Sequence, residues 1–174
     1  MGDIVLAGST SGTTTLTPAA VSGTTTLTLP ATTSTLAING PAFRAYRSGN
    51  QTISAATTTK VALNAETFDT NSNFDSTTNY RFTPTVAGYY QVNGVISFTT
   101  GAGQPAIFKN GATYSTGLEV TYNVSLGGHI PIAELVYLNG STDYIELYVY
   151  LTTGTTISSG ESNTAFSASM VRSA

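Results

Sequence analysis

The sequence predicts an all-β protein, with a β-sandwich or jelly-roll head over residues 41–174 and an extended, β-rich N-terminal arm over residues 1–40. Three observations predict this class. Roughly a fifth of the residues are threonine, accompanied by ten tyrosines and 17 glycines, which favours pleated strands joined by tight turns. Several segments alternate apolar and polar residues with a period of two, and none shows a helical period. Asn-Gly pairs also separate some of the apolar runs.

A repeat organises the arm. The seven residues Ser11–Thr17 recur as Ser22–Thr28, with a period of 11 residues. Each copy is rich in β-branched residues between a glycine and a proline, which predicts short strands. The arm has few large apolar side chains, so it needs a partner surface, and we expect Leu16, Leu27 and Leu29 to anchor it. A flexible low-complexity linker is the alternative.

Three segments of the head read as sandwich strands with one buried face. The first places on one face Tyr90, Val92, Gly94, Ile96 and Phe98. The second alternates Leu118, Val120, Tyr122 and Val124 with polar residues. The third alternates Ile145, Leu147, Val149 and Leu151 with Tyr144, Glu146, Tyr148 and Tyr150.

Two dipeptides in the head predict tight turns. Asn110-Gly111 and Asn139-Gly140 both lie between apolar runs. Asn-Gly is a strong hairpin signal because both residues tolerate a positive φ. We therefore expect an antiparallel hairpin at each position.

Several motifs of the head occur together in order. Phe74-Asp75 is followed by Phe82 and then by Gly88-Tyr89-Tyr90, and segments 136–147 and 166–171 follow as closing strands. In these motifs the head, residues 41–174, resembles the C1q-like family. The resemblance implies a jelly roll of the tumour-necrosis-factor type that assembles as a homotrimer. For the trimer interface the candidates are Tyr90, Tyr148 and Tyr150, with ordinary surface tyrosines as the alternative.

The arm stands where C1q proteins carry a collagen stalk. It resembles the N-terminal tracts of structural proteins from tailed bacteriophages that bear C1q-like heads. This resemblance implies a virion protein on the particle surface, as a capsid decoration, head fibre or short tail fibre, with the arm contacting other capsid or tail proteins. A receptor- or glycan-binding module, an adhesin or lectin recognising a host cell-surface glycan or protein, is the alternative.

A short acidic and amide-rich segment offers a possible metal site. It contains, at every second position, Asp69, Asn71, Asn73 and Asp75. This spacing matches part of a calcium-binding loop, but Phe74 occupies the place where glycine is expected. A turn stabilised by Asp and Asn side chains is the alternative, and no other cofactor is expected.

Composition argues against several other classes. His129 is the single histidine and cysteine is absent, so neither a catalytic triad nor a zinc site is expected and the protein is predicted not to be an enzyme. The net charge is −3 with six dispersed basic residues, which disfavours nucleic-acid binding. No apolar run approaches the roughly 18 residues of a membrane span.

Overall fold

The structure, a computed structural model, describes residues 4–7, 11–16, 40–122 and 128–174. The chain divides into two compact units, Met1–Ser34 and Thr35–Ala174. In the first unit, β1 (Ile4–Ala7) pairs antiparallel with β2 (Thr13–Leu16). Strand β2 coincides with the first copy of the threonine-rich repeat, whereas the second copy lies outside the described residues. The anchoring role of this region stays a prediction.

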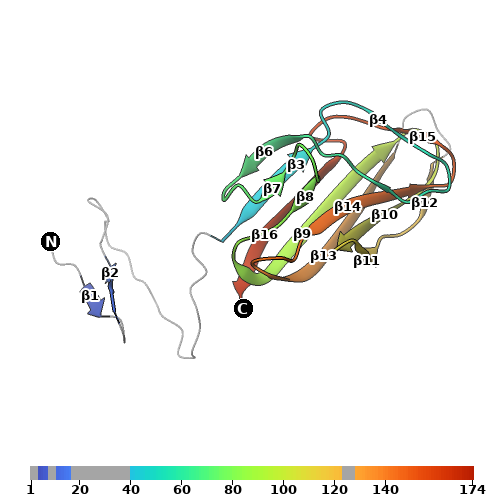
Figure 1. The fold of residues 1–174 in the computed structure, drawn as a ribbon. Coiled ribbons are helices and arrows are strands. Elements are labelled where there is room, and N and C mark those ends of the chain that lie inside the picture. The colour runs from blue at the N-terminus through green and yellow to red at the C-terminus, as the bar shows by residue number, and fades with distance from the viewer. Residues whose placement is uncertain (1–3, 8–10, 17–39, 123–127) are drawn as a thin grey trace, which may run out of the picture. The chain divides into compact units, whose positions relative to one another are not determined.

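The second unit is a sandwich of two antiparallel sheets (Figure 1). We name one the β9 sheet, which consists of β3 (Ala42–Tyr46), β4 (Gln51–Ile53), β6 (Ala65–Asp69), β9 (Ala87–Phe98), β13 (Gly128–Asn139), β15 (Thr155–Ile157) and β16 (Ala165–Ser173). We name the other the β14 sheet, which consists of β5 (Thr59–Lys60), β7 (Phe74–Asp75), β8 (Arg81–Phe82), β10 (Gly101–Lys109), β11 (Ala112–Thr116), β12 (Val120–Tyr122) and β14 (Ile145–Leu151).

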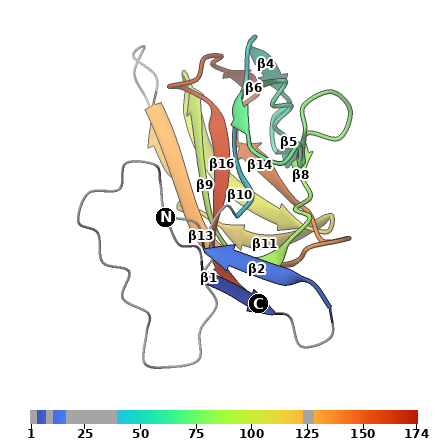
Figure 2. The same ribbon diagram turned by 90° about the vertical axis from the view of Figure 1, so that its left-hand side faces the viewer.

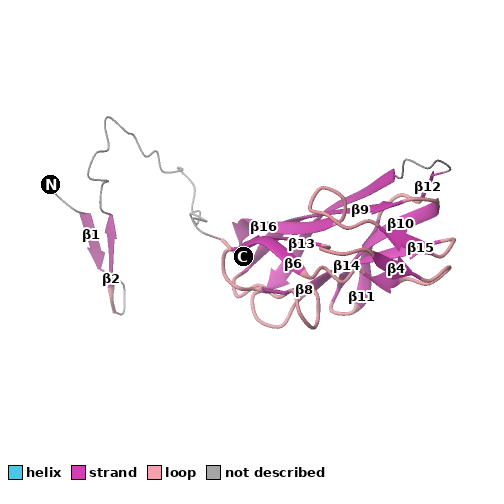
Figure 3. Cartoon of the chain, turned by 90° about the horizontal axis from the view of Figure 1, so that it is seen from above, coloured by secondary structure: helices cyan, strands magenta, loops and turns pink. Residues whose placement is uncertain are grey.

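Strands and loops alone make up the described parts of the chain (Figure 3). Within those parts, no helix has the length and apolar character needed to cross a bilayer. The abundance of threonine and tyrosine, which suit a pleated and half-buried surface, accounts for this outcome. The all-β prediction is confirmed.

Strand β9 lies in the interior of its sheet, with neighbours on both edges. Strand β13 pairs with it along its whole length, from Ala87 opposite Asn139 to Phe98 opposite Gly128. Strand β16 pairs with its other edge, so β9 lies between β13 and β16 (Figure 2). Strands β3 and β6 continue the sheet beyond β16. In the second layer, β14 lies between β10 on one side and β5 and β8 on the other.

The core fills the space between the two sheets. Alternate residues of β9 and β14 point inward, as the sequence predicts, so Val92, Ile96, Leu147 and Val149 are fully buried. Aromatic rings cluster at one end, where Phe43 stacks on Phe82 with centroids 4.5 Å apart. Burying each such ring contributes about 1.5–3 kcal/mol, so this cluster holds the sheets together.

At Gly94 of β9, the neighbouring side chains leave no room for a Cβ atom. A Cβ added there would lie 2.8 Å from Leu147 Cδ1 and 3.0 Å from Ile132 Cγ2. Because both neighbours are buried core residues, they have little room to move away. The missing side chain therefore lets β14 pack directly against β9.

The two Asn-Gly turns have different outcomes. Asn110 and Gly111 both have positive φ, at 54° and 78°, and connect the paired strands β10 and β11, so the first hairpin is confirmed. Asn139-Gly140 instead joins β13 to β14, which belong to different sheets, and this hairpin prediction is wrong. The Asn139 Oδ1 atom accepts hydrogen bonds from three successive backbone N–H groups, of residues 141–143, and this turn carries the chain from one layer to the other.

The strand predicted around residues 118–124 starts later than expected. Strand β12 covers Val120–Tyr122, and Leu118, which the alternation assigns to a buried face, is 79% exposed. Val124 lies outside the described residues. The reason is pairing: β12 contacts only the first three residues of β10, from Gly101 to Gly103, so the ladder starts at Val120.

Candidate interaction surfaces

Tyr90, one of the tyrosines predicted at the trimer interface, lies in the core. Its side chain is fully buried, and its hydroxyl donates a hydrogen bond to the carbonyl oxygen of Val86 at 2.6 Å. Burial raises the pKa of Tyr90 to about 12, because the phenolate would lose its hydration. The prediction for Tyr90 is therefore wrong, since a side chain enclosed within one subunit has no surface left to contact another.

The outward face of the β9 sheet, which points away from the β14 sheet, carries four neighbouring exposed apolar side chains. We name as the apolar stripe Tyr89, Leu135, Tyr137 and Val171, which are 42%, 48%, 40% and 54% exposed. Tyr89 lies opposite Tyr137 on β13, with ring centroids 5.5 Å apart. Val171 occupies the register shift of β16 beside the β9 strand. Three adjacent strands thus contribute to one continuous apolar surface.

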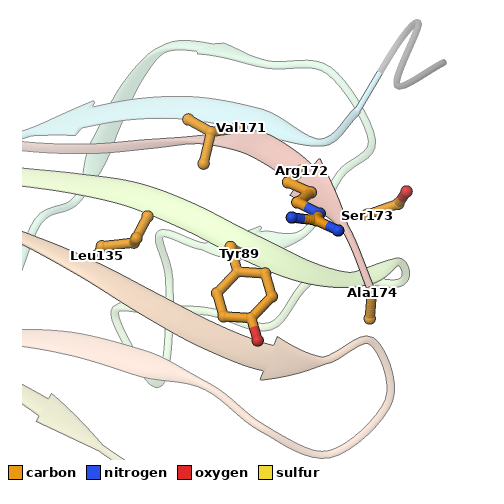
Figure 4. Close-up of a pocket in the computed structure, with 6 residues that line it drawn as sticks. All are labelled: Tyr89, Leu135, Val171, Arg172, Ser173 and Ala174. Atoms are coloured by element: carbon orange, nitrogen blue, oxygen red, sulfur yellow. The ribbon is translucent and has the colours of Figure 1, made fainter. Parts of the chain in front are cut away.

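An open cavity of about 550 Å³ lies within this face. Its lining consists of Tyr89, Leu135, Val171, Arg172, Ser173 and Ala174 (Figure 4). The polar side chains of this lining are the phenol of Tyr89, the guanidinium of Arg172 and the hydroxyl of Ser173, so the lining lacks a carboxylate or imidazole side chain suited to acid–base catalysis. The cavity is better suited to receive an apolar group than to carry out chemistry.

The outward face of the β14 sheet is aromatic as well, but its rings have partners within the chain. We name as the aromatic face the half-buried residues Phe108, Tyr144, Tyr148 and Tyr150. Phe108 and Tyr148 stack with centroids 3.9 Å apart and an angle of 19° between the rings. The guanidinium of Arg81 lies 4.2 Å from the centroid of Tyr144. Subunit contacts through Tyr148 and Tyr150 stay a prediction.

An ion pair between Lys60 and Glu146 lies beside Tyr148 of the aromatic face. Lys60 Nζ lies 2.5 Å from Glu146 Oε1, and the Glu146 side chain is only 4% exposed. Lys60 also donates a hydrogen bond to the carbonyl oxygen of Asn79 at 3.2 Å and lies opposite Tyr148 in the strand register. Burial lowers the pKa of Lys60, but the hydrogen bond and the charge of Glu146 outweigh burial and raise it overall. The ammonium therefore neutralises a buried carboxylate.

The oxygen atoms of the possible calcium segment bond mainly to the backbone. Asp69 accepts hydrogen bonds from the N–H groups of Asn71 at 3.3 Å and Phe74 at 2.7 Å. Asn73 Oδ1 accepts from the N–H of Thr85 at 3.2 Å. This arrangement is typical of the turn that the sequence leaves as the alternative. Among the described residues, no three His, Cys, Asp or Glu side chains are grouped as a metal site.

Asp75 is the last residue of the possible calcium segment. Its carboxylate accepts hydrogen bonds from the backbone N–H groups of Thr77, Thr78 and Asn79, at 3.0, 2.9 and 3.0 Å. The hydrogen bond from Thr78 is the main reason that the pKa of Asp75 lies well below its usual range. Calcium binding by Asp69, Asn71, Asn73 and Asp75 stays an untested prediction.

The other predicted residues lie apart from both faces or outside the described chain. Leu16 ends strand β2, whereas Leu27 and Leu29 lie outside the described residues. His129 is exposed near the start of β13, and its Nε2 lies 3.3 Å from Asn163 Oδ1, an amide rather than an acid or a nucleophile. This contact gives His129 no partner for catalysis.

The sequence reasoning missed the apolar stripe. A signal was present, because Leu135 to Leu138 form an uninterrupted apolar run and Tyr89 directly precedes the buried Tyr90. In a strand, such runs place apolar side chains on both faces. The outward members are therefore expected to be covered by another surface.

Comparison with known proteins identifies the fold. No protein-family model matches the sequence, and the curated proteins contain no significant match. Among solved structures, the globular domain of zebrafish complement 1qA protein matches with a TM-score of 0.61 and 17% identity, covering 77% of this chain and 99% of that one. The fold is a jelly roll of the C1q and tumour-necrosis-factor type.

Two further structures extend the comparison. Eiger TNF from S. frugiperda has a TM-score of 0.63 and 9% identity, covering 78% of this chain and 96% of that one. The PRD1 vertex protein P5 has a TM-score of 0.56 and 16% identity, covering 76% and 97%. The predicted jelly roll is confirmed, and at these identities the similarity concerns the fold alone.

Proposed function

We propose that this protein is a non-enzymatic structural component of a tailed-bacteriophage particle. In this proposal it is a homotrimer, its heads are displayed on the particle surface, and its arm, residues 1–40, contacts other virion proteins. The observation that carries the proposal is the apolar stripe, a continuous surface without a partner among the described residues of one chain.

A second copy of the chain is the occupant that the stripe favours. Its four residues carry no formal charge, and the cavity beside them adds a single charged side chain, Arg172. Contiguous exposed apolar surface of this kind marks interaction sites, and an uncharged one suits contact with an equivalent apolar surface. Cyclic assembly lets each subunit bury its stripe in the same way.

The virion location draws on two further features. The PRD1 vertex protein P5 has the same fold over almost its whole length, which supports a place for such a head on a virus particle. The threonine-rich arm bears no charge between Asp3 and Arg44, and it cannot form a core of its own. Contact with other virion proteins would supply the partner surface that the arm needs.

Sedimentation of the full chain tests the assembly. We expect a species with three times the 18.0 kDa mass of one chain. Leu135→Asp and Val171→Asp each place a charge in the stripe and should yield monomers, because an unpaired carboxylate is costly to bury. Leu118→Asp is the matched control, since Leu118 is 79% exposed outside the stripe, and it should stay trimeric. A wild-type monomer would contradict the proposal.

Truncation tests the role of the arm. Particles assembled with a chain lacking residues 1–38 should contain little of the truncated protein, while the full chain is incorporated. Quantitative gel analysis of purified particles measures both. Equal incorporation of the two chains would reject anchoring by the arm. That result would leave the proposal of a trimer unchanged, because sedimentation tests it separately.

A further inference from the structure

Strand β13 forms an edge of the β9 sheet. It is 12 residues long, and β9 is its only strand partner among the described residues (Figure 2). A long sheet edge presents a row of unpaired N–H and C=O groups, to which a strand of another molecule can add. The outward backbone groups of β13 therefore decide whether the protein is open to such addition.

Every second residue of β13 directs its backbone groups away from β9. Residues of an antiparallel pair alternate between those that exchange hydrogen bonds with the partner strand and those whose N–H and C=O point the other way. Ser97, which lies opposite His129, shows this alternation. Its backbone bonds on the side of β15 and β16, where it accepts from the N–H of Ser158 at 2.8 Å and donates to Thr164 Oγ1 at 3.3 Å. The odd-numbered residues from His129 to Tyr137 therefore present their backbone groups at the free edge.

Side chains of the β14 sheet cover three of the outward carbonyl groups. The pairs, with the donor first, are Tyr122 with His129 at 3.1 Å, Tyr114 with Leu135 at 3.4 Å, and Lys109 with Tyr137 at 2.7 Å. A strand adding to this edge would need the same carbonyl oxygens for its own N–H groups. The covering side chains also occupy the space beside β13 that such a strand would fill.

Pro131 removes a donor from the same edge. It lies two residues after His129, at an outward position, and proline has no backbone N–H. The segment between β11 and β12 passes close by, since a Cβ added to Gly117 would lie 3.4 Å from the carbonyl oxygen of Pro131. Proline within a sheet is found at such edges, because it cannot donate to a neighbouring strand. The edge thus lacks a donor at one position and has covered acceptors at others.

We propose that Pro131 and the donors Lys109, Tyr114 and Tyr122 close the β13 edge against strand addition by a second copy of the chain. The need for closure is clear from the neighbouring surface, because Leu135 belongs both to this edge and to the apolar stripe. Two copies that meet through their stripes bring their edges close together, where open edges would pair without limit. The inference goes beyond the proposed function, since edge closure protects a monomer as well as a trimer.

The test opens the edge while keeping the aromatic rings. Pro131→Ala restores a backbone N–H at an exposed position, and Tyr114→Phe and Tyr122→Phe remove the two hydroxyl donors. The triple variant of the full chain should form species larger than those of the wild type at least about tenfold faster, measured by light scattering well below thermal unfolding. Tyr150→Phe, on the outward face of β14, is the matched control and should behave as the wild type.

Hydrogen exchange locates the new contact. The outward N–H groups of Ala133, Leu135 and Tyr137 should gain protection in the larger species, because an added strand would use them. Growth no faster than that of the Tyr150→Phe control would overturn the inference. Growth without protection of these three N–H groups would overturn it as well, since it would show contact at another surface.

Pro131→Ala alone keeps the test decisive if the triple variant does not fold. Its side chain is exposed, so the substitution removes little packing, and growth should still be about threefold faster than in the wild type. An unchanged rate in this folded variant, verified by urea unfolding, would overturn the inference. Sedimentation of the wild type reports separately on the trimer, and a wild-type monomer would contradict the proposed function while leaving edge closure intact.

Discussion

The two outward faces of the sandwich are both rich in tyrosine, yet they differ in what their side chains contact. On the β14 sheet, Tyr148 stacks with Phe108 and adjoins an ion pair. On the β9 sheet, Leu135 and Val171 are about half exposed, at 48% and 54%. One face is completed within the chain, whereas the other leaves its apolar side chains exposed. Exposed aromatic content alone therefore does not distinguish the two faces; the presence or absence of internal partners does.

The largest effect of a single change is expected at the ion pair of the completed face. Lys60→Met leaves the buried Glu146 carboxylate without its partner, and we expect a loss of about 3 kcal/mol in the free energy of unfolding, measured in urea. The double variant Lys60→Met with Glu146→Leu should recover most of this loss. A single variant as stable as the wild type would show that the face does not depend on the pair.

The same ion pair predicts a flat response to mild alkali. Because the pKa of Lys60 is raised above its usual 10.5 in the folded state, its contribution is fully present below that pH. Stability is lost only as the pH rises through the higher folded-state value. Urea midpoints should therefore show no loss from this pair between about pH 7 and 10. A decline within that window, absent in the double variant, would contradict the assignment.

Removing a stacked ring should cost less than breaking the ion pair. Tyr148→Ala deletes the partner of Phe108, and we expect about 2 kcal/mol of destabilisation. Tyr137→Ala on the stripe removes a ring that is 40% exposed and should destabilise a dissociated chain by less. Chemical unfolding of both variants at low concentration makes the comparison. A larger loss of unfolding free energy in Tyr137→Ala than in Tyr148→Ala would contradict the contrast between the two faces.

A smaller effect is expected at the turn before β8. Asp75→Ala removes three backbone hydrogen bonds at a solvent-accessible site, for a loss of about 1 kcal/mol. Because the pKa of Asp75 is depressed, its contribution is present above the usual value of 3.8 and is lost as the pH falls toward the folded-state value. Asp75→Asn keeps an acceptor and should remove this acid sensitivity. If the wild type and the Asp75→Asn variant lost the same stability in urea below about pH 4, the proposed role of the Asp75 carboxylate would be contradicted.

The smallest change in folding stability is expected on the stripe. Leu135→Ser should alter the unfolding free energy of the dissociated chain by less than about 0.5 kcal/mol, because no internal partner is lost. The Leu135→Ser substitution should instead weaken the assembly of subunits. The wild-type thermal midpoint should rise with protein concentration, and that of Leu135→Ser should not. Equal concentration dependence would mean that Leu135 lies outside the interface.

Local patterns predicted the parts of the head that depend on neighbouring residues. The alternation around Val92 and Leu147 identified the buried faces of β9 and β14, because side-chain direction in a strand has a period of two. The turn at Asn110 was predicted because positive φ is a local property. Leu118 shows the limit of such patterns, since its exposure depends on where β12 finds a partner.

The sequence by itself determined the all-β class, the inward face of the long strands and the hairpin at Asn110-Gly111. Only the tertiary structure decided that Asn139 carries the chain between sheets, that Tyr90 is enclosed, and that Tyr89 and Tyr137 adjoin Val171 on one surface. The physical reason is that strand pairing joins residues far apart in the chain, such as β9 with β13 and β16, and pairing decides which outward side chains become neighbours.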